Sequence, residues 1–230
     1  MGVTINQMGE KSEVLFKVFG LGVTAEVTTM WAIVAVLIVL AFILSRHIKE
    51  KPGKLQNAAE VGVGALENFI KGVLGEEKTK RYFGFFATLF IFIAFCNYSG
   101  LLPGAGIIKG FKAPTSSLSV TAGLGIVVFC AIHYLGVRSN GVHYFKHFIK
   151  PVVIMLPFMI IDEIVRPVSL ALRLFGNIFG EETVMEQLYE ILPIGAPLLM
   201  MVLSLLFCGI QAVVFTMLAG IYIDDATTLE

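Results

Sequence analysis

The chain has 230 residues, of which 57% are hydrophobic and 15% are charged, and its mean hydropathy is +0.84. A soluble domain is about 45–50% apolar and about 25% charged, so this composition excludes a typical soluble globular protein. The 17 basic and 17 acidic residues cancel to a formal charge of zero, so the net charge gives no support to nucleic acid as a partner. The three cysteines stand far apart in apolar runs, and we interpret them as buried thiols.

Five apolar blocks follow one another along the chain, at residues 27–45, 82–102, 118–137, 151–192 and 194–223. A membrane-spanning helix needs about 20 mainly apolar residues. The last two blocks are longer than a perpendicular crossing requires, which predicts helices that tilt, kink or double back. We therefore expect an all-α membrane protein with five membrane-embedded helical units, the last two forming a long tilted hairpin. Residues 27–230 are expected to form a single polytopic membrane domain in the lipid bilayer, after an N-terminal segment of residues 1–26.

The distribution of basic residues predicts the orientation of these blocks. Lys and Arg collect on the cytoplasmic side of a membrane protein. The loop between the second and third blocks holds only Lys109 and Lys112, whereas the segment after the first block is strongly basic, with Arg46, Lys49, Lys51, Lys54, Lys71, Lys78, Lys80 and Arg81. The pattern predicts an extracytoplasmic N-terminus and a cytoplasmic C-terminus.

Residues 57–75 carry apolar side chains at helical spacing opposite Glu60, Glu67 and Lys71. This pattern predicts an amphipathic helix on the cytoplasmic surface or against a partner.

Motifs of soluble enzymes and metal sites are weak in this chain. His143 and His147 have the i, i+4 spacing of a metal-binding pair but lack a third ligand, and we interpret them as interfacial histidines beside Lys146. We expect no metal, no cofactor and no catalytic residue of an enzyme.

The block at 151–192 contains charged residues, which are unfavourable inside a membrane helix and therefore indicate a function. An arginine or aspartate at the centre of a span costs about 2.5–3.5 kcal/mol even on translocon scales. Arg173 lies between Leu172 and Leu174 with aliphatic and aromatic neighbours on both sides, so a solvated surface explains it poorly. For Glu186 and Glu190, near the end of the block, a solvated surface is a serious alternative. We interpret Arg173 as a functional residue.

Helical geometry separates the polar residues of this block into two stripes, because successive residues of an α-helix turn by about 100°. The first stripe holds Asp162, Arg166, Ser169, Arg173, Asn177 and Gly180. The second holds Glu182, Glu186 and Glu190. Arg173 and Glu182 are nine residues apart and therefore point to opposite sides of one helix. Pro167 makes the start of the first stripe less regular.

A turn near Leu192 would bring the last two blocks into antiparallel contact. Residues equally distant from the turn then lie level, which pairs Arg173 with Gln211 and places Ser204 within about one turn of Glu182. The Gln211 amide can hydrogen-bond a guanidinium, although a role in helix packing alone is also open.

At these residues the chain resembles the a subunit of the F-type ATP synthase membrane sector. The resemblance rests on residues 166–177, RPVSLALRLFGN, and 209–219, GIQAVVFTMLA, and extends to NYSGLLP at 97–103 and Pro114-Thr115. It implies a non-catalytic stator subunit with two aqueous half-channels beside a rotating ring of c subunits, joined to the b-subunit peripheral stalk in a bacterial plasma membrane. It assigns Arg173 to the face toward the ring, Asn177 and Gln211 to its surroundings, and Glu182 to a half-channel.

Two residues depart from what the resemblance implies. Ser117 stands where many members have an aspartate, and Ser204 stands where some relatives have a histidine that pairs with the glutamate. The additional Glu181 is not a general feature of the family. We expect Glu181 or Glu186 to be a second carboxylate near Glu182, with Ser204 as a hydroxyl neighbour.

Two other classes of protein would also contain buried charges. A secondary transporter needs them near the midplane, but the chain has no paired segments interrupted by Gly or Pro in two halves. A structural scaffold leaves Arg173 and the acidic stripe unexplained. The sequence does not distinguish a proton from a sodium ion as the translocated species.

Overall fold

The computed structural model describes residues 14–18, 21–46, 53–102, 111–141, 144, 156–192 and 195–228. The elements are β1 (Val14–Val18), β2 (Leu21–Thr24), α1 (Ala25–Arg46), α2 (Lys54–Ser99), the 3-10 helix η2 (Pro114–Ser116), α3 (Leu118–Asn140), α5 (Leu156–Ile191) and α6 (Gly195–Thr227). The predominance of long helices confirms the predicted α class. The predicted pair His143 and His147 lies outside the described residues.

Within the described residues, α1, α2, α3 and α6 are long and apolar enough to cross a membrane. α5 carries eight acidic or basic residues, which interrupt its apolar surface. The predicted number of five membrane-embedded units therefore stays a prediction.

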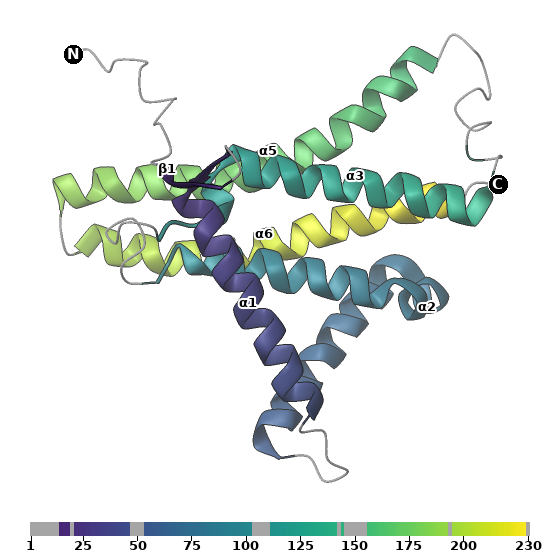
Figure 1. Cartoon of the computed structure of the whole chain (residues 1–230), viewed down its shortest axis with the longest axis horizontal. Helices are drawn as coiled ribbons and strands as arrows, with labels where there is room; N and C mark the ends of the chain where they lie inside the picture. The colour runs from purple at the N-terminus through teal and green to yellow at the C-terminus, as the bar shows by residue number, and fades with distance from the viewer. Residues whose placement is uncertain are drawn as a thin grey trace.

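Four helical segments share one long axis, and α1 runs crosswise to them. The C-terminal part of α2 lies along this axis with α3, α5 and α6, whereas α1 leaves the bundle near β1 (Figure 1). At a rise of 1.5 Å per residue α5 and α6 are each about 50 Å long, and α1 is about 33 Å long. α1 and α3, with 22 and 23 residues, match the roughly 30 Å of a bilayer's hydrocarbon, whereas α5 and α6 exceed it. The predicted tilt of the hairpin that α5 and α6 form stays a prediction.

A sharp turn at Gly75 divides α2 into two helical parts. Gly75 has φ +76°, which is a backbone conformation that favours glycine. The part before Gly75 matches the predicted amphipathic helix. Its buried side chains Leu66, Ile70 and Leu74 join one hydrophobic core with Phe86 of the second part of α2 and with Phe215, Ala219 and Ile223 of α6. The apolar face of this helix therefore packs against the chain's own α6, and its position on the cytoplasmic side stays a prediction.

Polar contacts join the helices at both ends of the bundle. At one end Lys78 Nζ donates to the Asp224 carboxylate and to Thr228 Oγ1, and Asn140 Nδ2 donates to the carbonyl of Ala226. At the other end Asn97 Nδ2 donates to the carbonyl of Cys208 at 3.3 Å. These contacts fix the register of α6 against α2 and α3.

The sequence did not predict the small hairpin that precedes α1. β1 and β2 pair antiparallel, with Val18 opposite Leu21, and the chain passes from β2 directly into α1. The hairpin lies beside the start of α1 (Figure 1).

Candidate functional site

The polar residues of the candidate site are carried by α5, which is one helix from Leu156 to Ile191. This continuity confirms the unbroken helix on which the two predicted stripes depend. Leu170, Leu174 and Ile178 are buried, and they fix the face of α5 that packs on the rest of the bundle. α3 approaches this face closely at Gly125, where a Cβ atom would lie 2.9 Å from the Pro167 carbonyl oxygen.

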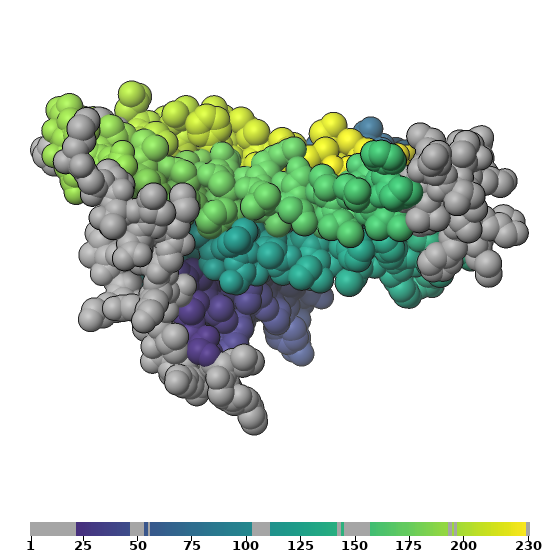
Figure 2. All heavy atoms as spheres, turned by 90° about the horizontal axis from the view of Figure 1, so that it is seen from above, coloured from purple at the N-terminus to yellow at the C-terminus, as the bar shows by residue number. Residues whose placement is uncertain are grey.

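Arg173 lies on the outer side of α5, where its side chain is exposed. It has no hydrogen bond or ion pair to any other residue that the structure describes. α5 and α6 occupy one long side of the molecule (Figure 2). The surface of these two helices is strongly apolar, with exposed Val168, Leu172, Phe179, Val202, Leu203, Leu206, Phe207, Ile210, Val213 and Met217. Arg173 is therefore a cation on an apolar surface, without a partner in the part of the chain that the structure describes.

Gln211 of α6 is 5% exposed, and its Nε2 has no hydrogen-bond partner among the described residues. The predicted hydrogen bond between Gln211 and Arg173 is not formed between these two described side chains. Asn177 is half-buried, one turn after Arg173 on the same stripe. An unpaired buried amide costs about 1–3 kcal/mol. Gln211 thus has unused hydrogen-bonding capacity next to α5.

Glu181 faces α6. Its Oε2 accepts from Cys208 Sγ at 3.9 Å, and Ser204 lies near the carboxylate, with its own Oγ unpartnered among the described residues. Its Oε1 is buried without a partner in the described part of the chain. These contacts agree with the antiparallel register predicted for the hairpin, which placed Ser204 within about one turn of Glu182.

Glu182 faces the opposite flank of α5, toward η2 and α1. Ser116 lies near its carboxylate, although the Ser116 hydroxyl donates to the Ala113 carbonyl at 2.9 Å, and the charges of Lys112, Glu186 and Glu26 act on the carboxylate. Glu186 is exposed. The adjacent residues Glu181 and Glu182 thus serve two different inter-helix spaces.

A second polar cluster, which the sequence analysis did not assign to a function, lies near the N-terminal half of α5. His133 Nε2 of α3 is 3.8 Å from Glu163 Oε1, and both side chains are largely buried. The His133 ring packs edge-on against Tyr144, with centroids 6.0 Å apart. Burial, and then the charge of Glu163, raises the pKa of Tyr144 to about 12, so this phenol keeps its proton at neutral pH.

Next to this cluster Arg166 pairs with Asp162 one turn earlier, at 2.9 Å, and its guanidinium lies over the Tyr222 ring of α6. Arg166 therefore has a carboxylate and an aromatic ring, whereas Arg173 has neither within the described residues. Residue spacing places Arg166 and Arg173 on one stripe of α5, so the sequence could not predict that Arg166 has these partners and that Arg173 has neither among the described residues.

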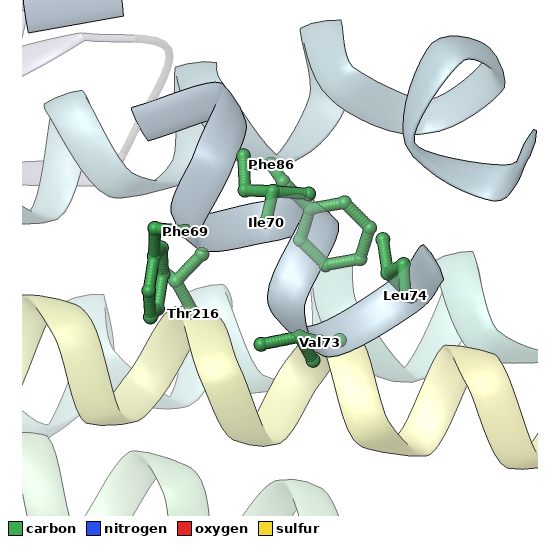
Figure 3. A pocket seen from close by; sticks show the side chains of 7 residues that line it. Phe69, Ile70, Val73, Leu74, Phe86 and Thr216 are labelled. Carbon is green, nitrogen blue, oxygen red and sulfur yellow. The ribbon is translucent and has the colours of Figure 1, made fainter. Parts of the chain in front are cut away.

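A small pocket between α2 and α6 is apolar. Its walls are Phe69, Ile70, Val73, Leu74, Phe86, Thr216 and Gly220 (Figure 3). A Cβ atom at Gly220 would lie 3.0 Å from Val73 Cγ1, so the pocket is a packing contact between the helices. It holds no cluster of polar groups that could bind a ligand.

Comparison with known proteins agrees with this arrangement. The model of the ATP synthase A chain family matches residues 27–224. The chain belongs to the ATP synthase A chain family. "ATP synthase subunit a 1" of Syntrophotalea carbinolica is 41% identical over 89% of this chain and 86% of its own length. "ATP synthase subunit a" of Geotalea daltonii and of Geobacter sulfurreducens are each 39% identical over 85% of this chain and 84% of their own length.

Membership of the A chain family confirms the resemblance found in the sequence. The family is that of a membrane subunit of ATP synthase, so ATP synthesis and ion transport are the processes in which the chain takes part. Other subunits of the same complex are implied as partners, and catalysis belongs to them. The matched region covers all five long helices, and the relatives named above are bacterial.

Proposed function

We propose that this chain is the ion-translocating stator subunit in which Arg173 separates two aqueous half-channels and faces a rotating ring of c subunits. The observation that carries this proposal is the exposed, unpaired Arg173 on the apolar surface of α5 and α6. An arginine keeps its charge at every accessible pH, so it is a permanent barrier to a cation and a permanent partner for a carboxylate.

The outer half-channel ends at Glu182, with Glu181 and Ser204 on the α6 side. Glu182 lies about 13.5 Å from Arg173 along the helix axis, toward the end of the bundle that the basic-residue distribution predicts to be extracytoplasmic. Each of these two carboxylates lies in its own partly buried space between helices, where it can bind a cation transiently.

The inner half-channel contains the pair His133 and Glu163. Glu163 lies ten residues before Arg173, about 15 Å along the axis in the opposite direction. An imidazole exchanges protons near neutral pH, and a neighbouring carboxylate orients it. Each side of Arg173 thus has a carboxylate at a distance along the helix axis of about half the hydrocarbon thickness, which suits two half-channels that do not meet.

The proposed partners are the c-subunit ring on the surface around Arg173 and the b-subunit peripheral stalk elsewhere on the chain. The proposed location is a bacterial plasma membrane. The coupling ion is a proton or a sodium ion, since the chain's own carboxylates accept either.

The test is ATP-driven ion pumping by the complete complex in inverted membrane vesicles. Arg173→Ala should abolish pumping while the complex remains assembled, and Arg173→Lys should be almost as damaging because an ammonium can lose its proton and lacks the planar fork. Arg138→Ala is the matched control, since Arg138 is exposed at the end of α3 and contacts Tyr134. Retained pumping in Arg173→Ala vesicles would overturn the proposal.

A further inference from the structure

Glu26 is a buried acid for which the proposed function has no role. It lies in the first turn of α1 and is 5% exposed. Its Oε2 has no hydrogen-bond partner among the described residues. A carboxylate is favoured near a helix N-terminus by the helix dipole, but an exposed carboxylate obtains the same benefit without desolvation. Its position in the helix therefore does not explain its burial.

Three elements meet around this carboxylate. Glu26 comes from α1, and Glu182 comes from α5, 156 residues later; the charge of Glu26 acts on the Glu182 carboxylate. η2 lies between them, since it contacts both helices. The backbone N–H of Lys112 donates to Thr29 Oγ1 at 3.4 Å, which ties the segment before η2 to α1.

Polar oxygens line this meeting point. Ser116 of η2 is 7% exposed and lies near Glu182, and its hydroxyl donates to the Ala113 carbonyl at 2.9 Å. The adjacent Thr115 is fully buried, and its Oγ1 also lacks a partner in the described part of the chain. Carboxylate and hydroxyl oxygens are the ligands of hard cations and of protons.

The charges of the space are not balanced. Lys112 acts on Glu182, but no ion pair within 4.0 Å joins Lys112 to either carboxylate in the residues described. Around Glu182 the positive charge of Lys112 is therefore opposed by the negative charges of Glu186 and Glu26. Two buried carboxylates are costly unless a cation or a shared proton neutralises part of their charge.

We propose that Glu26 and Glu182 form a site for one monovalent cation, a proton or a sodium ion, between α1 and α5 beside η2. The inference rests on the proposed function, because the site lies at the Glu182 end of the outer half-channel. It gives α1 a role in ion uptake in addition to its expected role as a membrane-spanning helix.

The experiment is ATP synthesis by the complete complex in vesicles with an imposed ion gradient, in which ions enter from the extracytoplasmic side. One series varies the outer pH without sodium, and a second varies outer sodium at fixed pH. Glu26→Gln keeps the volume of the side chain and removes its charge. The matched control is Glu60→Gln, since Glu60 is exposed on α2 and accepts a hydrogen bond from Gln56 Nε2 of the same helix.

In Glu26→Gln the cation concentration at half-maximal rate should rise about tenfold, the equivalent of one pKa unit at a two-carboxylate site. A shift in the pH series alone identifies a proton, and a shift in the sodium series identifies sodium. The charged groups that act on Glu182 together with Glu26 are Glu186 of α5 and Lys112 before η2. Because the two carboxylates share one ligand, Glu26→Gln should add little to the effect of Glu182→Gln.

Wild-type half-saturation of assembled Glu26→Gln in both series would overturn the site. If Glu26→Gln does not assemble, Glu26→Asp carries the test: it should raise half-saturation by a smaller factor, and an unchanged value would overturn the site. Arg173→Ala in the same vesicles separates the two proposals. Coupled synthesis in Arg173→Ala contradicts the proposed function, whereas lost coupling there with unchanged Glu26→Gln contradicts the Glu26 site alone.

Discussion

Arg173 and Glu182 lie on opposite flanks of α5, nine residues apart on one unbroken helix. Arg173 is exposed on the apolar outer surface, and Glu182 is directed toward Ser116 of η2. The body of α5 therefore stands between the permanent cation and the carboxylate. An ion at Glu182 has to leave that flank before it reaches the surface of Arg173.

This separation predicts different defects for the two residues. Glu182→Gln should slow ATP-driven pumping by an order of magnitude, about the effect of one lost proton-transfer group, without raising passive leak. Glu67→Gln, an exposed acid on α2, should pump at the wild-type rate. In Glu182→Cys, silver ions should inhibit from the extracytoplasmic side. A thiol inaccessible from both sides, together with normal pumping by Glu182→Gln, would remove Glu182 from the half-channel.

The orientation of the bundle predicts sided labelling of two exposed positions. Lys54→Cys, at the start of α2, should react with a membrane-impermeant maleimide only from the cytoplasmic side. Leu102→Cys, just after α2, should react only from the outside, because the distribution of basic residues places the loop after this helix on the extracytoplasmic side. The reverse pattern would invert the assignment of the outer and inner half-channels.

The contact between α3 and α5 predicts opposite effects for two neighbouring glycines. Gly125→Ala should lower the thermal stability of the purified complex, because the new Cβ would lie 2.9 Å from the Pro167 carbonyl oxygen and the helices must separate, at a cost of about 1–3 kcal/mol. Gly123→Ala has open space around it and should be neutral or stabilising by up to about 1 kcal/mol, since alanine favours a helix. If the two variants had equal thermal stability, α3 and α5 would lie farther apart at Gly125 and Pro167 than the structure shows.

Helical periodicity predicted the local features of the site well. The half-turn between Arg173 and Glu182 depends only on residues in one helix, and the contact of Glu181 with Ser204 follows from a hairpin with equal rise on both arms. Both required nothing beyond an unbroken α5.

Contacts between distant elements were not predictable in this way. The reversal at Gly75 decides that Leu66 and Ile70 pack on α6, and no periodicity encodes the direction of such a turn. The approach of Glu26 to Glu182 depends on the crossing of α1 over the bundle. The difference between Arg166, which is paired, and Arg173, which is not, likewise depends on the position of Asp162 and Tyr222 after folding.

Passive ion leak through Arg173→Ala tests the barrier at Arg173 most directly. The measurement uses vesicles stripped of the catalytic sector and given a potassium diffusion potential. An imposed ion gradient should decay faster in Arg173→Ala vesicles than in wild-type vesicles. The double variant Arg173→Ala with Glu182→Gln should restore slow decay, because the outer half-channel is then impaired. Arg173→Ala vesicles that hold the gradient as long as wild type, with the membrane sector assembled, would contradict the claim that Arg173 separates two half-channels.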